Sequence, residues 1–304
     1  MAFTAADVKN LREMTGVGMM DCKKALTASD GDIDKAIEWL REKGMAASAK
    51  KAGRIAAEGM AYAAVYDGVG VVVEVNAETD FVGKNEKFVE FVKGVAATVA
   101  KENPADLAAL MECKYLDTDL TVTQEQQEMV LVIGENIKVR RFARFADGFS
   151  VPYIHAGGKI GVLVNLQVEG GVDATEIGKD VAMQIAALNP RFWDKSQVTE
   201  DVLEEEKKIV LAQMDNDPKM ASKPAQVKEK IALGKMNKFY SENCLLQQEF
   251  VKDSSMSVEK YIASAAKALG GTVTFKDAVR FEKGEGIEKK EENFADEIAK
   301  MVKG

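Results

Sequence analysis

The stretch GVVVEVNAETDFVGK, residues 70–84, sets the pattern from which the rest of the chain can be interpreted. Residues 70–76 are mostly apolar and β-branched, as is typical of a buried strand. The turn residues Asp67-Gly68 and another apolar run precede them, so we expect a β-hairpin. The exposed corner Thr79-Asp80-Phe81-Val82 follows, and then a helix with one apolar face, formed by Phe88, Phe91, Val92, Val95 and Val99.

The same order of elements recurs later in the chain. The glycines at 157 and 158 turn into an apolar strand at 161–167, and a helix follows with Ile177, Val181, Ile185 and Leu188 on one face. Between these units, a helix is expected to stop at Gly134, and an edge-like strand follows around Ile137 and Val139. Residues 273–281 are expected to form a further strand. The chain therefore belongs to the α+β class, with a duplicated core and antiparallel sheets.

The first 45 residues predict three short helices that form a small bundle. A capping box at Thr4 and Asp7 starts the first helix, Gly16 and Gly18 end it, and residues 19–28 form the second. Met19 and Met20 are adjacent and cannot both face one narrow core stripe, so we expect at least one of them to be available to a partner. Partial burial of both remains the alternative. Residues 46–59 are interpreted as a helical connector, whose charges Lys50, Lys51 and Arg54 suit a solvated face.

Residues 199–243 are rich in charged helix formers, with a break at 215–218 and a new start near Pro224. This pattern predicts a protruding antiparallel helical hairpin with a thin apolar seam, formed by Leu203, Val210, Met214, Val227 and Ile231. Such an arm suits interaction or dimerisation. A short C-terminal helix is expected after Gly284 and Gly286, with the apolar residues Phe294, Ile298, Met301 and Val302.

These patterns divide the chain into five parts. The bundle and its connector occupy residues 1–54, and the first core unit occupies residues 55–150. The second core unit combines residues 151–198 with 244–282, because the hairpin at 199–243 interrupts it. Residues 283–304 form a C-terminal helical module.

Composition narrows the classes of function. The chain has 304 residues, of which 46% are hydrophobic, enough for well-filled cores, and its net charge is −8. Broad phosphate-driven binding of nucleic acid needs a basic surface, so we expect a protein partner and no direct nucleic acid. Neither a leader peptide nor a membrane span is expected, which favours a soluble cytoplasmic protein. Cys22, Cys113 and Cys244 are far apart and are interpreted as reduced structural thiols.

The residue patterns of common catalytic and cofactor sites are missing. His155 is the only histidine, and no serine or cysteine stands at a recognisable nucleophile elbow. Residues 157–160, GGKI, lack the first glycine and the hydroxyl residue of a phosphate-binding loop and suit a hairpin turn. The consecutive acids Glu204, Glu205 and Glu206 do not converge as metal ligands and suit a solvated helix face. We therefore expect no enzyme and no cofactor.

The corner at residues 79–82 has two interpretations. Phe81 turns inward and staples the following helix, or it points outward as an apolar probe beside the Asp80 carboxylate. Asp80 either orients the corner by accepting backbone donors at the helix start or contacts a partner.

Along essentially its whole length the chain resembles bacterial elongation factor Ts, the guanine-nucleotide exchange factor of elongation factor Tu. Residues 11–26, LREMTGVGMMDCKKAL, resemble the family's first signature, and residues 74–84 its second. Further agreement comes from GENI at 134–137 with the arginine pair at 140–141, from GKIGVLV at 158–164, and from RFEKGEGIE at 280–288. Two sequence differences flank the corner, Ala77 and Gly83, and both are near-isosteric. Gln184 stands where many members have histidine, which puts a histidine-dependent contact of that helix in doubt.

The resemblance implies a ubiquitin-associated-like N-terminal bundle, a duplicated core, a protruding coiled coil and a C-terminal module. It implies that Thr79, Asp80, Phe81 and Val82 enter the GTPase near its magnesium ion. Leu11, Met19, Met20 and Lys23 of the bundle and Ile287 of the C-terminal module are then the candidate partner-binding residues. The expected partner is elongation factor Tu, both GDP-bound and nucleotide-free, with a homodimer through the hairpin as a further expectation. The competing hypothesis is an RNA-associated or chaperone-like adaptor without exchange activity, suggested by Lys50, Lys51, Arg54 and the arm.

Overall fold

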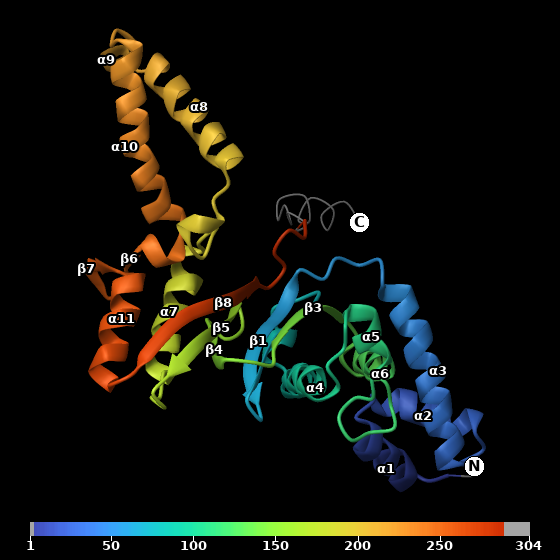
Figure 1. Ribbon diagram of the computed structural model, residues 1–304. Coiled ribbons are helices and arrows are strands. Elements are labelled where there is room, and N and C mark those ends of the chain that lie inside the picture. The colour runs from blue at the N-terminus through green and yellow to red at the C-terminus, as the bar shows by residue number, and fades with distance from the viewer. Residues whose placement is uncertain (1–2, 289–304) are drawn as a thin grey trace.

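The computed structural model describes residues 3–288 (Figure 1). It begins with three helices, α1 (Ala5–Thr15), α2 (Met19–Ala28) and α3 (Ile33–Lys51). Thr4 and Asp7 form the expected capping box, and Gly16 ends α1 in the left-handed conformation with φ 68°. The buried side chains between the helices are Val8, Leu11, Val17, Cys22, Ala25, Leu26, Ala36 and Leu40. The predicted small bundle is confirmed, although α3 continues to Lys51, so the first part of the expected connector, residues 46–51, belongs to this helix.

The first sheet has the order β1-β2-β3 and is antiparallel throughout. Its strands are β1 (Glu58–Tyr66), β2 (Val69–Ala77) and β3 (Lys138–Phe145). Asp67 and Gly68 form the predicted turn, with φ 49° and 84°. One face of the sheet packs on α4 (Glu86–Glu102), and α5 (Leu107–Glu112) and α6 (Val122–Ile133) complete this half. Gly134 ends α6, as its sequence pattern predicts.

The second sheet repeats the plan with the order β4-β5-β8. Its strands are β4 (Phe149–His155), β5 (Ile160–Glu169) and β8 (Thr272–Glu282), and α7 (Thr175–Leu188) covers one face. The small strands β6 (Glu249–Phe250) and β7 (Asp253–Ser257) and the helix α11 (Val258–Leu269) complete this half. In each half a hairpin is followed by a helix, and a later strand then pairs with the second strand of the hairpin.

The two halves agree in detail along their middle strands. The pairing of β2 with β3 shifts register between Glu74 and Val75, and that of β5 with β8 shifts between Asn165 and Leu166. Each middle strand contains a glycine near its start, Gly70 in β2 and Gly161 in β5. In both strands the shift falls between the fourth and the fifth residue after that glycine. A bulge at the same position in both halves supports the internal duplication predicted from the sequence.

The two sheets pack face to face, and the alternation along the middle strands explains how. Val71, Val73 and Val75 face the α4 side, whereas Val72 faces the other sheet. Leu163, which occupies the equivalent position in β5, joins Val72 in the cluster between the sheets, together with Ala61, Ala63 and Phe281. Small residues permit a close approach there, since the Ala61 amide donates a hydrogen bond to the Gly158 carbonyl oxygen at 2.8 Å. Both middle strands are therefore buried on both faces.

A helical hairpin leaves the second half between α7 and β6, and Figure 1 shows it projecting away from the body. It consists of α8 (Glu200–Asn216), the short α9 (Pro218–Ala221) and α10 (Ala225–Asn243). Its buried seam contains Val210, Met214, Ala232 and Met236. The predicted hairpin is confirmed, but Val227 is exposed, because Ala232 and Met236 are the residues of α10 that face α8.

Gln184 lies inside the second half and is fully buried. Its side-chain amide donates to the Glu249 carbonyl oxygen at 3.0 Å, and its Oε1 accepts from the Val251 amide at 2.8 Å. Gln184 therefore ties α7 to the β6–β7 hairpin. Phe294, Ile298, Met301 and Val302 lie outside the described residues, and the five-part division of the chain stays a prediction. Among residues 3–288, no helix is long and apolar enough to cross a membrane.

Candidate functional site

The corner at residues 79–82 connects the end of β2 to the start of α4. Asn85 caps α4, because its Oδ1 accepts hydrogen bonds from the amides of Lys87 at 3.0 Å and Phe88 at 3.3 Å. Val82 turns inward and is only 5% exposed, whereas Phe81 is 82% exposed. Val82 thus has the anchoring role that one interpretation gave to Phe81, and the Phe81 ring is left in solvent. An aromatic ring this exposed gains nothing from its own core.

Glu135, in the loop between α6 and β3, holds the corner in place. Its Oε2 accepts hydrogen bonds from the backbone amides of Glu78 and Thr79, both at 3.0 Å, and its Oε1 accepts from the Thr79 hydroxyl at 2.7 Å. The Glu78 carboxylate in turn accepts from the Asn136 amide at 2.6 Å. The corner is therefore fastened to a second loop more than fifty residues later in the chain. Residue types alone did not single out Glu135 for this role, although it lies within the GENI segment that resembles the family.

Asp80 is exposed, and within residues 3–288 its carboxylate has no hydrogen-bond partner. The expectation that it accepts the backbone donors at the helix start is wrong, because Asn85 accepts two of them and Glu135 orients the preceding turn. The Asp80 carboxylate is thus left facing solvent next to the Phe81 ring. Contact with a partner is the alternative that remains.

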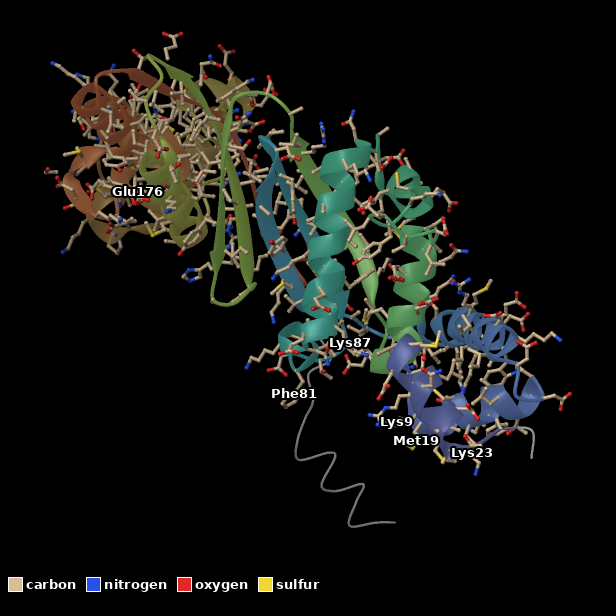
Figure 2. The ribbon with its side chains drawn as sticks, turned by 90° about the horizontal axis from the view of Figure 1, so that it is seen from below. Lys9, Met19, Lys23, Phe81, Lys87 and Glu176 are labelled. Atoms are coloured by element: carbon tan, nitrogen blue, oxygen red, sulfur yellow. The ribbon has the colours of Figure 1, made fainter. Side chains whose placement is uncertain are left out.

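The helical bundle presents a second exposed apolar surface. Met19 and Met20 are 49% and 65% exposed, so both are accessible, and Lys23 is exposed one turn later on α2. Leu11 has no exposed surface and supports α1 from inside the bundle instead of contacting solvent. Figure 2 shows Phe81, Lys87, Lys9, Met19 and Lys23 along one side of the molecule. The corner and the bundle therefore offer their exposed side chains in the same direction.

A groove separates these two surfaces, and it is lined by Lys9, Arg12, Glu13, Gly16, Met19 and Lys87. The Lys87 ammonium donates a hydrogen bond across it to the Gly16 carbonyl oxygen at 3.4 Å. This contact links the start of α4 to the C-terminal end of α1, where a cation is favourable.

The packing of α3 on α6 sets the position of the bundle. Leu131 and Val132 of α6 pack against the bundle core, and Arg41 forms an ion pair with Glu128 at 3.3 Å. Gly44 permits a close approach here, because a Cβ atom at this position would lie 3.2 Å from the Gln127 carbonyl oxygen. The distance between the bundle surface and the corner is thus set by packed helices and not by a flexible linker.

A buried charge network is centred on Glu74 of β2, the strand that leads into the corner. The Glu74 carboxylate is fully buried and accepts hydrogen bonds from Arg140 at 2.9 Å, Arg141 at 2.5 Å and the Gly284 amide at 2.8 Å. Burial by itself raises the pKa of Glu74, but the bonds from Gly284, Asn76 and the two arginines outweigh it, so this pKa lies below its ordinary value. The network fixes the turn at Gly284, three residues before the half-buried Ile287.

The structure offers little to nucleophilic or metal chemistry. Among residues 3–288 there is no group of three or more histidine, cysteine, aspartate or glutamate side chains that could hold a metal ion. His155 is exposed at the end of β4, with its Nδ1 3.1 Å from the Tyr153 hydroxyl. Burial raises the pKa of all three cysteine thiols, that of Cys244 to about 11. The arrangement is suited to binding, through exposed apolar side chains on a rigid support.

Comparisons with known proteins agree on one family. The family model described as "Elongation factor TS" matches residues 78–285, from the corner to the Gly284 turn. Elongation factor Ts of Clostridium kluyveri is 47% identical over 307 aligned residues, which cover 99% of both chains. The protein of the same name from Clostridium perfringens is 49% identical, with 98% of each chain covered. That of Syntrophotalea carbinolica is 46% identical, with both chains covered completely.

Proposed function

The chain belongs to the elongation factor Ts family of translation elongation factors, and we propose that it is the guanine-nucleotide exchange factor of elongation factor Tu. In this proposal it binds the GDP-bound GTPase, disturbs its magnesium site and promotes release of GDP, so that GTP can bind. No covalent bond is made or broken, and the protein needs no cofactor of its own. The place of action is the cytoplasm, where the partner works.

Thermodynamic linkage explains how binding alone drives the exchange. A protein that binds the nucleotide-free GTPase more tightly than the GDP-bound form must weaken GDP binding by the same factor. Mg²⁺ requires a nearly ideal octahedral shell and bridges the phosphates of the nucleotide. A side chain that displaces the loops around this ion therefore removes much of the partner's hold on GDP.

The observation that carries the proposal is the exposure of Phe81 on a fixed corner. Its ring is 82% exposed, while the adjoining Thr79 makes two hydrogen bonds to Glu135. Burial of a phenylalanine side chain contributes about 1.5 to 3 kcal/mol. Since each 1.4 kcal/mol corresponds to a factor of ten, insertion of this ring supplies roughly a ten- to hundredfold part of the coupling. Because the corner is already ordered, little of that energy is lost in ordering it.

The remaining candidate residues divide between contact and support. Phe81 and Asp80 are exposed and suit direct contact, whereas Val82 is buried and anchors the corner. Met19, Met20 and Lys23 suit a second contact surface on the bundle, with Leu11 behind them as support. Ile287 follows the turn that Glu74 fixes, which suits a contact made by the C-terminal module.

The adaptor hypothesis has weaker physical support. Of its three cations, Arg54 forms an ion pair with Glu78 at 3.4 Å, which directs it toward the corner loop. With a net charge of −8, the chain lacks the broad basic surface that nucleic-acid binding requires.

Release of fluorescent GDP from elongation factor Tu tests the proposal. We expect substoichiometric amounts of the native chain to accelerate release, and Phe81→Ala to lose roughly ten- to hundredfold of this effect while it folds normally. Val65→Ala, which truncates an exposed side chain at the other end of β1, is the matched control. No acceleration by the native chain would contradict exchange, and salt-steep RNA binding would then favour the adaptor.

A further inference from the structure

The strand β8 forms an open edge of the second sheet. In the order β4-β5-β8 it is paired with a strand on one side only, within residues 3–288. Its first residues, TVTF at 272–275, are uncharged and suit a strand, whereas Lys276 and Asp277 after them are of the kind that protects a sheet edge. Residues 272–275 therefore offer backbone groups to an extended segment that lies beside them.

The first half shows how such an edge is closed. There the Val139 amide of the edge strand β3 donates a hydrogen bond at 2.9 Å to Oε1 of Gln126 on α6. Phe275 is the counterpart of Val139 in β8, because both residues directly adjoin the register shift of their sheet. Both also lie five positions after the glycine that ends the preceding helix. In the described part of the chain, no side chain accepts a hydrogen bond from the Phe275 amide.

The two covering helices explain this difference. Both α6 and α11 have 12 residues, begin with a buried valine and end at a glycine in the left-handed conformation. Gln126 lies eight positions before Gly134, and the residue eight positions before Gly270 is Ile262. An isoleucine side chain cannot accept a hydrogen bond. The helix α11 thus leaves open the edge that α6 closes in the first half.

A groove of about 490 Å³ lies between α11 and this edge. Figure 1 shows α11 alongside the first part of β8. The apolar lining of the groove is formed by Leu246, Ile262, Ala263, Ala266, Val273 and Phe275. The two alanines are small, which leaves room for a side chain of another segment.

Two charged side chains of α11, Glu259 and Lys267, also line the groove. Both are exposed, and within residues 3–288 neither has an ion-pair partner. Along the helix they are about 12 Å apart. In an extended strand, two residues four positions apart face the same way and are about 13 Å apart. A strand in the groove can therefore place a cation opposite Glu259 and a carboxylate opposite Lys267, with an apolar residue between them.

We propose that this groove binds an extended segment of another protein, which pairs with residues 272–275 as a further strand of the second sheet. In complexes of this kind main-chain hydrogen bonds supply affinity, and the side chains that enter the groove supply specificity. The fitting segment has a cation, an apolar residue and a carboxylate at alternate positions. The groove belongs to the second half, whereas the corner and the bundle surface do not, so this proposal is independent of nucleotide exchange.

Fluorescence anisotropy of a labelled heptapeptide, TKTVTET, mixed with the full chain tests the proposal. We expect saturable binding, and about tenfold weaker binding of TKTVTKT, because a lysine then meets Lys267. Lys267→Glu should invert this preference. Lys260→Glu, which reverses an exposed cation of α11 outside the groove lining, is the matched control and should keep the native preference.

Two N-methylated forms of TKTVTET test the strand pairing itself. A strand directs alternate amides to its two edges, so methyl groups on one alternate set should abolish binding and methyl groups on the other should leave it intact. Ile262→Gln should also weaken binding, because it gives the Phe275 amide the acceptor that the first half has. Circular dichroism checks that this variant folds, and the methylated peptides decide without any substitution.

Three results would overturn the proposal. The first is the absence of saturable TKTVTET binding, and the second is equal binding of both methylated forms. The third is binding of an apolar dye where no peptide binds, which would assign the groove to a small ligand.

Discussion

The buried carboxylate of Glu74 accepts a hydrogen bond at 2.8 Å from the backbone amide of Gly284, a residue 210 positions later in the chain. Gly284 has φ 71°, and a Cβ atom there would lie 2.0 Å from the Ala57 carbonyl oxygen, so only glycine fits. The middle strand of the first sheet thereby fixes the place where the chain leaves the second sheet. One carboxylate connects the two halves of the core to the C-terminal segment.

This network makes stability depend on pH in the acid range. The pKa of Glu74 is lower in the folded protein, so the charged carboxylate stabilises the fold above the unfolded pKa of about 4.3. That contribution is lost as the pH falls through the folded pKa. We expect Glu74→Gln to cost about 3 to 5 kcal/mol near pH 7, because Arg140 and Arg141 lose their buried counter-charge. Urea unfolding of both proteins between about pH 3 and pH 7, a range that spans the unfolded pKa, measures this free energy of unfolding.

The comparison with an exposed acid separates the network from general acid unfolding. Glu90→Gln, which changes an exposed acid of α4, should cost little stability near pH 7. If Glu74→Gln lost as much stability between neutral and acid pH as the native chain does, the carboxylate would not be the titrating group.

Glu135 is predicted to act on exchange through the corner that it holds. In the native chain, the two carboxylate oxygens of Glu135 accept three hydrogen bonds from Glu78 and Thr79. Glu135→Gln keeps only one acceptor oxygen. Each lost bond to a charged group costs about 1.5 to 3 kcal/mol locally, so we expect a looser corner and slower GDP release. The control is Glu112→Gln, which changes an exposed acid of α5.

A double-mutant cycle distinguishes positioning from a separate contact. If Glu135 acts only through the ring of Phe81, Glu135→Gln should slow exchange much less in a Phe81→Ala background than in the native chain. Additive effects of the two substitutions would show that Glu135 affects the partner by another route.

Met19 and Met20 are expected to determine affinity more than the rate of the release step. Both are exposed on the bundle, a different module from the Phe81 corner. Replacing both with alanine should raise the concentration that gives half-maximal GDP release by tenfold or more, with little change in the maximal rate. Met45→Ala, at another exposed methionine of the bundle, is the control. Unchanged affinity of the double variant would refute this assignment.

Gly44 is expected to tune the spacing between the bundle and the corner. Alanine in an exposed helix interior is worth about 1 kcal/mol over glycine, and Gly234 of α10 has open space around it, so Gly234→Ala should stabilise the protein. Gly44→Ala should lack this gain, because its Cβ atom crowds the Gln127 carbonyl oxygen. We also expect it to weaken partner binding, since α3 must move relative to α6. Equal stabilisation by both substitutions in thermal unfolding would contradict this view.

The sequence by itself determined the elements and their order. The turn at Asp67-Gly68, the helix stop at Gly134 and the alternation in residues 70–76 are local signals, since backbone conformation and side-chain periodicity depend on near neighbours. The duplication was visible for the same reason, because two segments with one pattern fold into the same units. The sequence also marked residues 79–82 as a corner, but left open whether Phe81 turns inward or points outward.

Only the tertiary structure decided what depends on residues far apart in the chain. The exposure of Phe81 follows from the burial of Val82, and the order of the corner follows from Glu135, which no local pattern connects to Thr79. The burial of Leu11 and the outward direction of Val227 likewise depend on which helix packs on which face. Local conformational preferences set the helices and strands, but packing and buried hydrogen bonds between distant residues decide which side chains stay exposed for a partner.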